Sequence, residues 1–93
     1  MKVMWTDEAK VSYHQTIFDL LQKWPIEISI KLENAVNSLI HNLEHHNHIC
    51  PPSKKDSSFR RCVVSKQSSI IYKIGNNTIH LVGFIYNTSD HKY

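Results

Sequence analysis

Cationic and proton-transferring side chains gather in the second half of this 93-residue sequence. The candidate cations among them are Lys54, Lys55, Arg60, Arg61, Lys66 and Lys92. The side chains that could transfer a proton are Tyr72, His80, Tyr86 and His91. Cleavage of RNA without a metal needs a base for the 2′-hydroxyl, cations for the pentavalent phosphate and an acid for the leaving oxygen. These residue types therefore fit metal-independent attack on a phosphodiester, and we expect no cofactor.

The charge balance differs between the two halves of the chain. Residues 1–46 hold four lysines against six acids, whereas residues 47–93 hold seven Lys and Arg against Asp56 and Asp90. A local excess of positive charge is typical of a surface that meets a polyanion. The second half could therefore bind nucleic acid, although an ordinary solvated surface explains so modest an excess equally well.

Arg60 and Arg61 point to opposite faces of any strand that contains both of them. Only one of the two can then face away from a layer of helices. We favour Arg61 for that position, because Arg60 would share its side with Cys62 and Val64. Arg60 could still lie at the strand end and reach round to the same ligand, and for either arginine a solvated surface position or an ion pair is the alternative.

Tyr72 and Tyr86 are likewise predicted to face opposite sides of the sheet. Tyr72 alternates with Ile70 and Ile74, so packing against helices is its expected role. Tyr86 ends the last predicted strand, on what we expect to be the more open face. It is the better candidate for a catalytic site, although a tyrosine that caps the sheet would explain it as well.

Several histidines lie close together in residues 41–48, next to Cys50. His41 and His45 are one helical turn apart and could share a metal with His48 or Cys50. A protonated histidine is also favourable at the carboxyl end of a helix, because its positive charge lies at the negative end of the helix dipole. We favour this second interpretation and predict no metal site. Two cysteines are too few for a disulfide framework and are compatible with reduced thiols.

Two helices are expected to follow a short first strand. Thr6 is predicted to cap a helix after the apolar residues 3–5, because a hydroxyl followed by two acids is typical of a helix start. Apolar residues then recur at helical spacing, at Ala9, Tyr13, Ile17, Leu20, Leu21 and Trp24. Pro25 ends this helix and suits the first turn of a second one, which should run to about residue 44 or 46. The two should form an antiparallel hairpin.

A loop over residues 47–58 leads into three predicted strands, Phe59–Ser65, Ser68–Ile74 and Thr78–Tyr86. In the last of them Ile79, Leu81, Gly83 and Ile85 should share the face that carries the helices. The sequence therefore predicts one α+β domain over residues 1–93. Its order is β-α-α-β-β-β, with an antiparallel sheet packed on one face by a helical hairpin. No apolar run is long enough to cross a bilayer, so we expect a cytoplasmic protein without membrane contact.

Both this element order and the residues themselves resemble the RelE/ParE toxins of type II toxin–antitoxin systems. The resemblance is carried by the opening residues 3–9, the segment 59–74 and the stretch Asn77–Leu81, and it spans nearly the whole chain. It implies a toxin that a co-expressed antitoxin neutralises. It also implies either a metal-independent endoribonuclease that cuts mRNA on the ribosome or an inhibitor of DNA gyrase.

The carboxyl end departs from the family pattern. Related toxins commonly close the last strand with Asn-Arg, whereas here Asn87 is followed by Thr88. We expect a ribosome-dependent endonuclease with catalytic Arg61, Tyr86 and His91. The RNA-binding residues would be Lys54, Lys55, Arg60, Lys66 and Lys92. The missing arginine keeps two alternatives open: a gyrase inhibitor and an inactive member that regulates transcription with its antitoxin. Residues 90–93 could replace the lost arginine or could form an end without a role.

Overall fold

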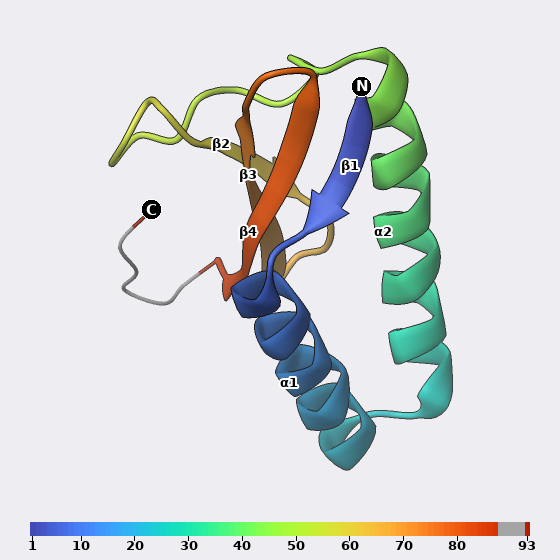
Figure 1. Ribbon diagram of the computed structural model, residues 1–93. Helices are drawn as coiled ribbons and strands as arrows, with labels where there is room; N and C mark the ends of the chain where they lie inside the picture. The colour runs from blue at the N-terminus through green and yellow to red at the C-terminus, as the bar shows by residue number, and fades with distance from the viewer. Residues whose placement is uncertain (88–92) are drawn as a thin grey trace.

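The computed structural model describes residues 1–87 and residue 93. Its elements are β1 (Lys2–Trp5), α1 (Asp7–Lys23), α2 (Ile26–His45), β2 (Arg60–Val63), β3 (Ser68–Ile74) and β4 (Thr78–Tyr86). The two helices run in opposite directions and cover one face of the sheet (Figure 1). The predicted α+β class and the order β-α-α-β-β-β are confirmed.

The sheet has the strand order β1-β4-β3-β2. β2, β3 and β4 form the expected antiparallel meander. β1 lies beside β4 and parallel to it, with Val3 opposite Ile79. The sheet is therefore mixed at this edge, because the chain leaves β1 through both helices and returns to it only with the last strand. β1 and β2 are the two edge strands.

The helix boundaries follow from local signals. The Oγ1 atom of Thr6 accepts a hydrogen bond from the backbone N–H of Ala9 at 3.1 Å and donates one to the carbonyl of Leu81 at 2.8 Å. Thr6 therefore caps α1 and also ties its start to β4. Pro25 stands between the helices as the residue that precedes α2. The Thr6 cap and the break at Pro25 agree with the sequence-based expectation, whereas Pro25 itself lies just before the first turn of α2.

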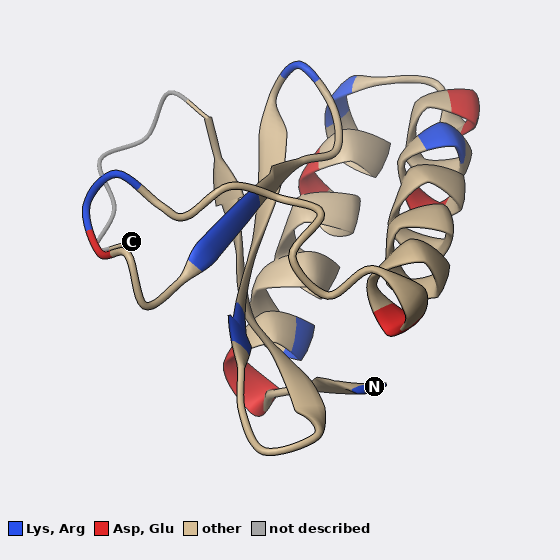
Figure 2. Cartoon of the chain, turned by 90° about the horizontal axis from the view of Figure 1, so that it is seen from above, with Lys and Arg blue, Asp and Glu red and all other residues tan. Residues whose placement is uncertain are grey.

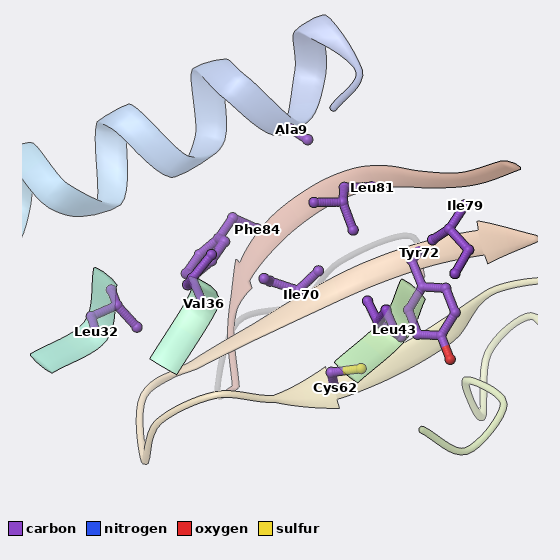
Figure 3. Close-up of a cluster of buried hydrophobic side chains, with 10 residues drawn as sticks. All are labelled: Ala9, Leu32, Val36, Leu43, Cys62, Ile70, Tyr72, Ile79, Leu81 and Phe84. Carbon is purple, nitrogen blue, oxygen red and sulfur yellow. The ribbon is translucent and has the colours of Figure 1, made fainter. Parts of the chain in front are cut away.

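The core lies between the helices and the sheet. Its buried members are Ala9, Leu32, Val36, Leu43, Cys62, Ile70, Tyr72, Ile79, Leu81 and Phe84 (Figure 3). Tyr72 is fully buried there, as its alternation predicted. Leu21 and Trp24 are exposed, so their assignment to the packed stripe of α1 is wrong. Both residues lie at the end of the helix that is joined to α2. This end of α1 extends beyond the sheet (Figure 1).

A β-bulge in β4 reverses the predicted alternation of that strand. Ile71 pairs with Gly83 and Tyr72 pairs with Leu81, so Val82 is an extra residue on β4. Beyond it the side chains exchange faces. The ring of Phe84 packs 5.2 Å from that of Tyr13 on α1, so Phe84 points to the helices. The prediction that Gly83 and Ile85 share the helix-covered face with Leu81 is therefore wrong.

The long loop is joined covalently to the sheet. Cys50 and Cys62 form a disulfide with their Cα atoms 5.3 Å apart. The interpretation of the two cysteines as reduced thiols is therefore wrong for this structure, because the loop folds back and brings Cys50 against the buried side of β2.

No helix in the described part of the chain is long and apolar enough to cross a membrane.

Candidate functional site

Arg61 lies on the sheet face opposite the helices and is held there by neutral groups. Its Nε donates to Ser69 Oγ at 3.2 Å, and one terminal nitrogen donates to Asn87 Oδ1 at 3.0 Å. Ser69 is fully buried and its hydroxyl donates to the same Asn87 oxygen. The Asn87 amide nitrogen donates to the carbonyls of Ser65 and Lys66. One carboxamide thus connects Arg61, β3 and the β2–β3 hairpin.

Lys54 and Lys55 share a pocket with Arg61. The pocket has a volume of about 380 Å³ and is lined by Pro51, Pro52, Ser53, Lys54, Lys55, Arg61, Val63 and Tyr93. We call it the basic pocket. Figure 2 shows segments coloured blue for Lys and Arg on β2 and on a loop that lies away from the helices. The backbone holds the loop against β2, because Arg61 donates its N–H to the carbonyl of Pro51 at 3.1 Å. Three sequence-predicted site residues therefore meet in one place.

Tyr93 covers the middle of this sheet face. Its ring packs edge-on against Phe59 at 5.1 Å between centroids. A Cβ atom added to Gly83 would lie 3.3 Å from this ring, so the glycine allows the close approach. The Tyr93 hydroxyl donates to the Glu8 carboxylate at 2.8 Å, and Ser53 donates its hydroxyl to the Tyr93 carbonyl. A phenol and a carboxylate therefore lie beside the basic pocket, on a face that we expected to be more open.

Acidic and aromatic groups border the basic pocket. Asp56 follows the two lysines, and hydrogen bonds from Ser58 hold the pKa of its carboxyl below the ordinary value. Asp56 is therefore a carboxylate at neutral pH. The Lys73 ammonium lies 5.7 Å above the centre of the Phe59 ring, a distance that suits a cation–π contact. The site is thus a basic pocket with one acid on the same loop.

Three other predicted site residues lie elsewhere. Arg60 faces the helix side and donates to the carbonyl of Cys50 at 2.6 Å. Lys66 lies in the hairpin and lines a separate groove. The Tyr86 hydroxyl donates to Asp19 on α1 at 2.9 Å, because the bulge at Val82 turns Tyr86 to the helix side. The expectation that Tyr86 lies on the open face with Arg61 is therefore wrong.

The environment of Tyr86 fits a structural role. Burial raises the pKa of its phenol above the ordinary value, and the hydrogen bond to Asp19 raises it further. The hydroxyl therefore stays protonated at neutral pH and serves as a donor to Asp19. His91 and Lys92 lie outside the described residues. Within the described part of the chain, no group of three or more His, Cys, Asp and Glu side chains is placed to hold a metal ion.

Sequence reasoning missed the residues that orient Arg61. Ser69 is the second of two serines that open β3, and no alternation in the sequence marked its hydroxyl as buried. Asn87 was visible only as part of a family pattern. Ser53 gave no local signal, because its role depends on contact with a residue 40 positions later in the chain.

An apolar groove lies between the helices and the β2–β3 hairpin. It has a volume of about 430 Å³ and is lined by Leu20, Ile28, Lys31, Leu32, Ala35, Val64, Ser65, Lys66, Gln67 and Ser68. We call it the apolar groove. Lys31 and Lys66 are the charged residues in its lining. The groove lies beside the end of the edge strand β2, where Val64 lines it.

The comparisons with solved structures identify this fold. The chain is similar to a YoeB/ParE toxin from Agrobacterium tumefaciens, with a TM-score of 0.69, 12% identity, and coverage of 94% of this chain and 99% of that one. It is also similar to a copper-bound mutant toxin from Helicobacter pylori, with a TM-score of 0.69, 14% identity, and coverage of 95% and 96%. No protein-family model and no curated protein matches the sequence. The fold is therefore that of the YoeB/ParE toxins.

Proposed function

We propose that this protein is the toxin of a toxin–antitoxin pair and a metal-independent endoribonuclease that cuts mRNA on the ribosome. The observation that carries the proposal is the meeting of Arg61, Lys54 and Lys55 in the basic pocket. The fold supports the proposal, because it is similar to that of a YoeB/ParE toxin. The helices leave one face of the sheet uncovered (Figure 1), and Arg61, which lines the pocket, lies on that face. Cations on a fixed framework are what a phosphodiester needs to react without a metal.

In the proposed reaction the 2′-hydroxyl of one nucleotide attacks the adjacent phosphorus. The new P–O bond closes a 2′,3′-cyclic phosphate, and the bond to the 5′-oxygen of the next nucleotide breaks. Arg61, fixed by Ser69 and Asn87, stabilises the charge of the phosphorane, and the two lysines bind the flanking phosphates. The hydroxyl of Tyr93 and the carboxylate of Glu8 are candidates for the proton transfers, since the two are hydrogen-bonded beside the pocket.

We further propose that the antitoxin occupies the apolar groove. Its apolar lining suits an amphipathic segment, and Lys31 and Lys66 favour acidic residues at the margins of that segment. The loop already pairs with the start of the β2 edge, where Ser53 donates to Phe59 and Arg61 donates to Pro51. The end of the strand near Val63 could pair with an extended stretch of the same partner. This position leaves the basic pocket on the opposite face of the sheet, so the partner would need a second segment to cover it.

The direct test is incubation of the purified protein with ribosomes that carry a defined mRNA, followed by mapping of the RNA ends. We expect cleavage within the transcript and a 2′,3′-cyclic phosphate at the new 3′ end, with undiminished activity in EDTA-treated protein. Intact mRNA would contradict the proposal.

A second candidate function is inhibition of DNA gyrase by binding. The specific observation in its favour is the position of Tyr86, which bonds Asp19 on the helix side and does not line the basic pocket. The pocket therefore lacks one expected proton-transfer group. A supercoiling assay with purified gyrase distinguishes the two candidates, because only a gyrase inhibitor would stop supercoiling while leaving mRNA intact. A protein without either effect would act with its antitoxin in regulation.

A further inference from the structure

His41 and His45 form a pair of imidazoles on the exposed side of the last turns of α2. Their ring centroids lie 5.1 Å apart, with the rings close to perpendicular. The spacing of four residues places both side chains on the same face of the helix, one turn apart. Both side chains are exposed, so small rotamer changes can turn the two rings toward a common ion.

The nitrogens of this pair are available to a ligand. Among the described residues, neither imidazole has a hydrogen-bond partner, and the contact between the rings is the interaction that the structure gives them. The functional proposal above uses neither residue, because the basic pocket lies on the other side of the sheet. The pair is therefore an independent feature.

The electrostatic setting favours a cation. His45 is the last residue of α2, a helix of 20 residues, and the backbone dipole places partial negative charge at that end. The carboxylate of Glu44 adds a formal negative charge between the two turns.

We propose that His41 and His45 chelate one divalent ion of a late first-row transition metal, with copper(II) bound most tightly. Imidazole nitrogens suit copper, nickel and zinc, and divalent affinities rise to a maximum at copper. Two imidazoles leave the remaining positions to water, an arrangement that copper(II) accepts in its tetragonal geometry. Hard cations such as Mg²⁺ select oxygen ligands and should not bind there.

The test is a calorimetric titration of the purified full chain with CuCl₂, NiCl₂, ZnCl₂ and MgCl₂, in a buffer that does not bind metals. We expect one copper site, weaker nickel and zinc binding, and no magnesium binding at the pair. His41→Ala and His45→Ala should each weaken copper binding at least tenfold. His14→Ala and His46→Ala remove exposed histidines outside the pair and serve as matched controls with unchanged affinity.

Electron paramagnetic resonance of the copper complex gives a second measurement. We expect hyperfine structure from two imidazole nitrogens in the wild type and its loss in His41→Ala, whose circular dichroism should remain that of the wild type because the side chain is exposed. Copper affinity that is equal in His41→Ala, His45→Ala and the wild type would overturn the proposal. So would a spectrum without imidazole coupling.

Discussion

At the scale of single residues, the partners of Arg61 determine what its charge can do. In the described part of the chain no carboxylate pairs with Arg61, and its hydrogen bonds go to the neutral oxygens of Ser69 and Asn87. An arginine held by neutral acceptors keeps a fixed orientation without having its charge cancelled. It is therefore preorganised for an anion, whereas Arg60, one residue earlier, is engaged by the carbonyl of Cys50 on the helix side.

Removal of the Asn87 carboxamide should disturb this orientation. Asn87→Ala removes the acceptor of Arg61 and Ser69 and the donor to two carbonyls of the hairpin. We expect single-turnover RNA cleavage to fall about tenfold, which corresponds to about 1.4 kcal/mol of barrier. The free energy of unfolding should fall by about 1–3 kcal/mol, because buried polar groups lose their partners. Asn76→Ala, in the exposed β3–β4 turn, is the control. Wild-type cleavage by Asn87→Ala would show that Arg61 does not depend on it.

The tyrosines predict a loss of stability in alkaline solution. Burial is the main cause that raises the pKa values of Tyr13, Tyr72 and Tyr86 in the folded chain. Because the folded state favours the neutral phenol, this contribution to stability is full below the unfolded pKa of about 10. It is lost as the pH rises through the folded values. Urea unfolding at pH 8 and pH 11 should therefore show a lower free energy at pH 11. Tyr86→Phe should reduce that difference, and equal losses in both proteins would exclude Tyr86 as a contributor.

At the scale of elements, the sequence predicts the ends of helices where those ends depend on residues that are neighbours in the chain. Thr6 and Pro25 determine the start of α1 and the break between the helices by local hydrogen bonding and sterics, so both were predictable. The bulge at Val82 was not, because valine is an ordinary strand residue and the extra position appears only when β4 is paired with β3. Because Val82 is an extra residue in β4, the side chain of Tyr86 lies on the helix side of the sheet and not on the open face. The covering of the open face by Tyr93 likewise depends on contacts between distant parts of the chain.

The disulfide should stabilise the loop that carries Lys54 and Lys55. It closes a loop with a sequence separation of 12 residues, for which chain entropy gives about 2–3 kcal/mol of stabilisation. The double variant Cys50→Ser and Cys62→Ser should lose about that amount in urea unfolding. Wild-type protein in dithiothreitol should lose a similar amount, whereas the variant should not respond to the reductant. Two thiols that react in unreduced wild-type protein would show that the bond is absent.

At the scale of the whole molecule, the sheet separates two surfaces with different chemistry. The basic pocket lies on the face that the helices leave uncovered, and the apolar groove lies between the helices and the hairpin. One surface therefore suits a polyanion and the other an amphipathic protein segment. The division follows from the two-layer architecture, in which the helices can cover only one face of the sheet (Figure 1).

A charge placed in the apolar groove should weaken the proposed antitoxin complex. Ala35→Glu puts a carboxylate into the lining, whereas Asn34→Glu puts one on the neighbouring exposed position of α2. We expect co-purification of the product of the adjacent open reading frame to fall at least tenfold for Ala35→Glu. It should remain unchanged for Asn34→Glu. If both variants retain the partner, the groove is not its binding site.

The proposed role of Arg61 in the basic pocket is to stabilise a reacting phosphodiester. The most direct measurement is the single-turnover rate of mRNA cleavage on programmed ribosomes for wild type, Arg61→Ala and Lys10→Ala, the last being an exposed cation on α1. We expect a rate about a hundredfold to a thousandfold lower for Arg61→Ala, which is typical of removing one preorganised donor from a transition state. Lys10→Ala should cleave at the wild-type rate, and all three proteins should be folded. Cleavage by Arg61→Ala at the wild-type rate would show that Arg61 does not stabilise the reacting phosphodiester.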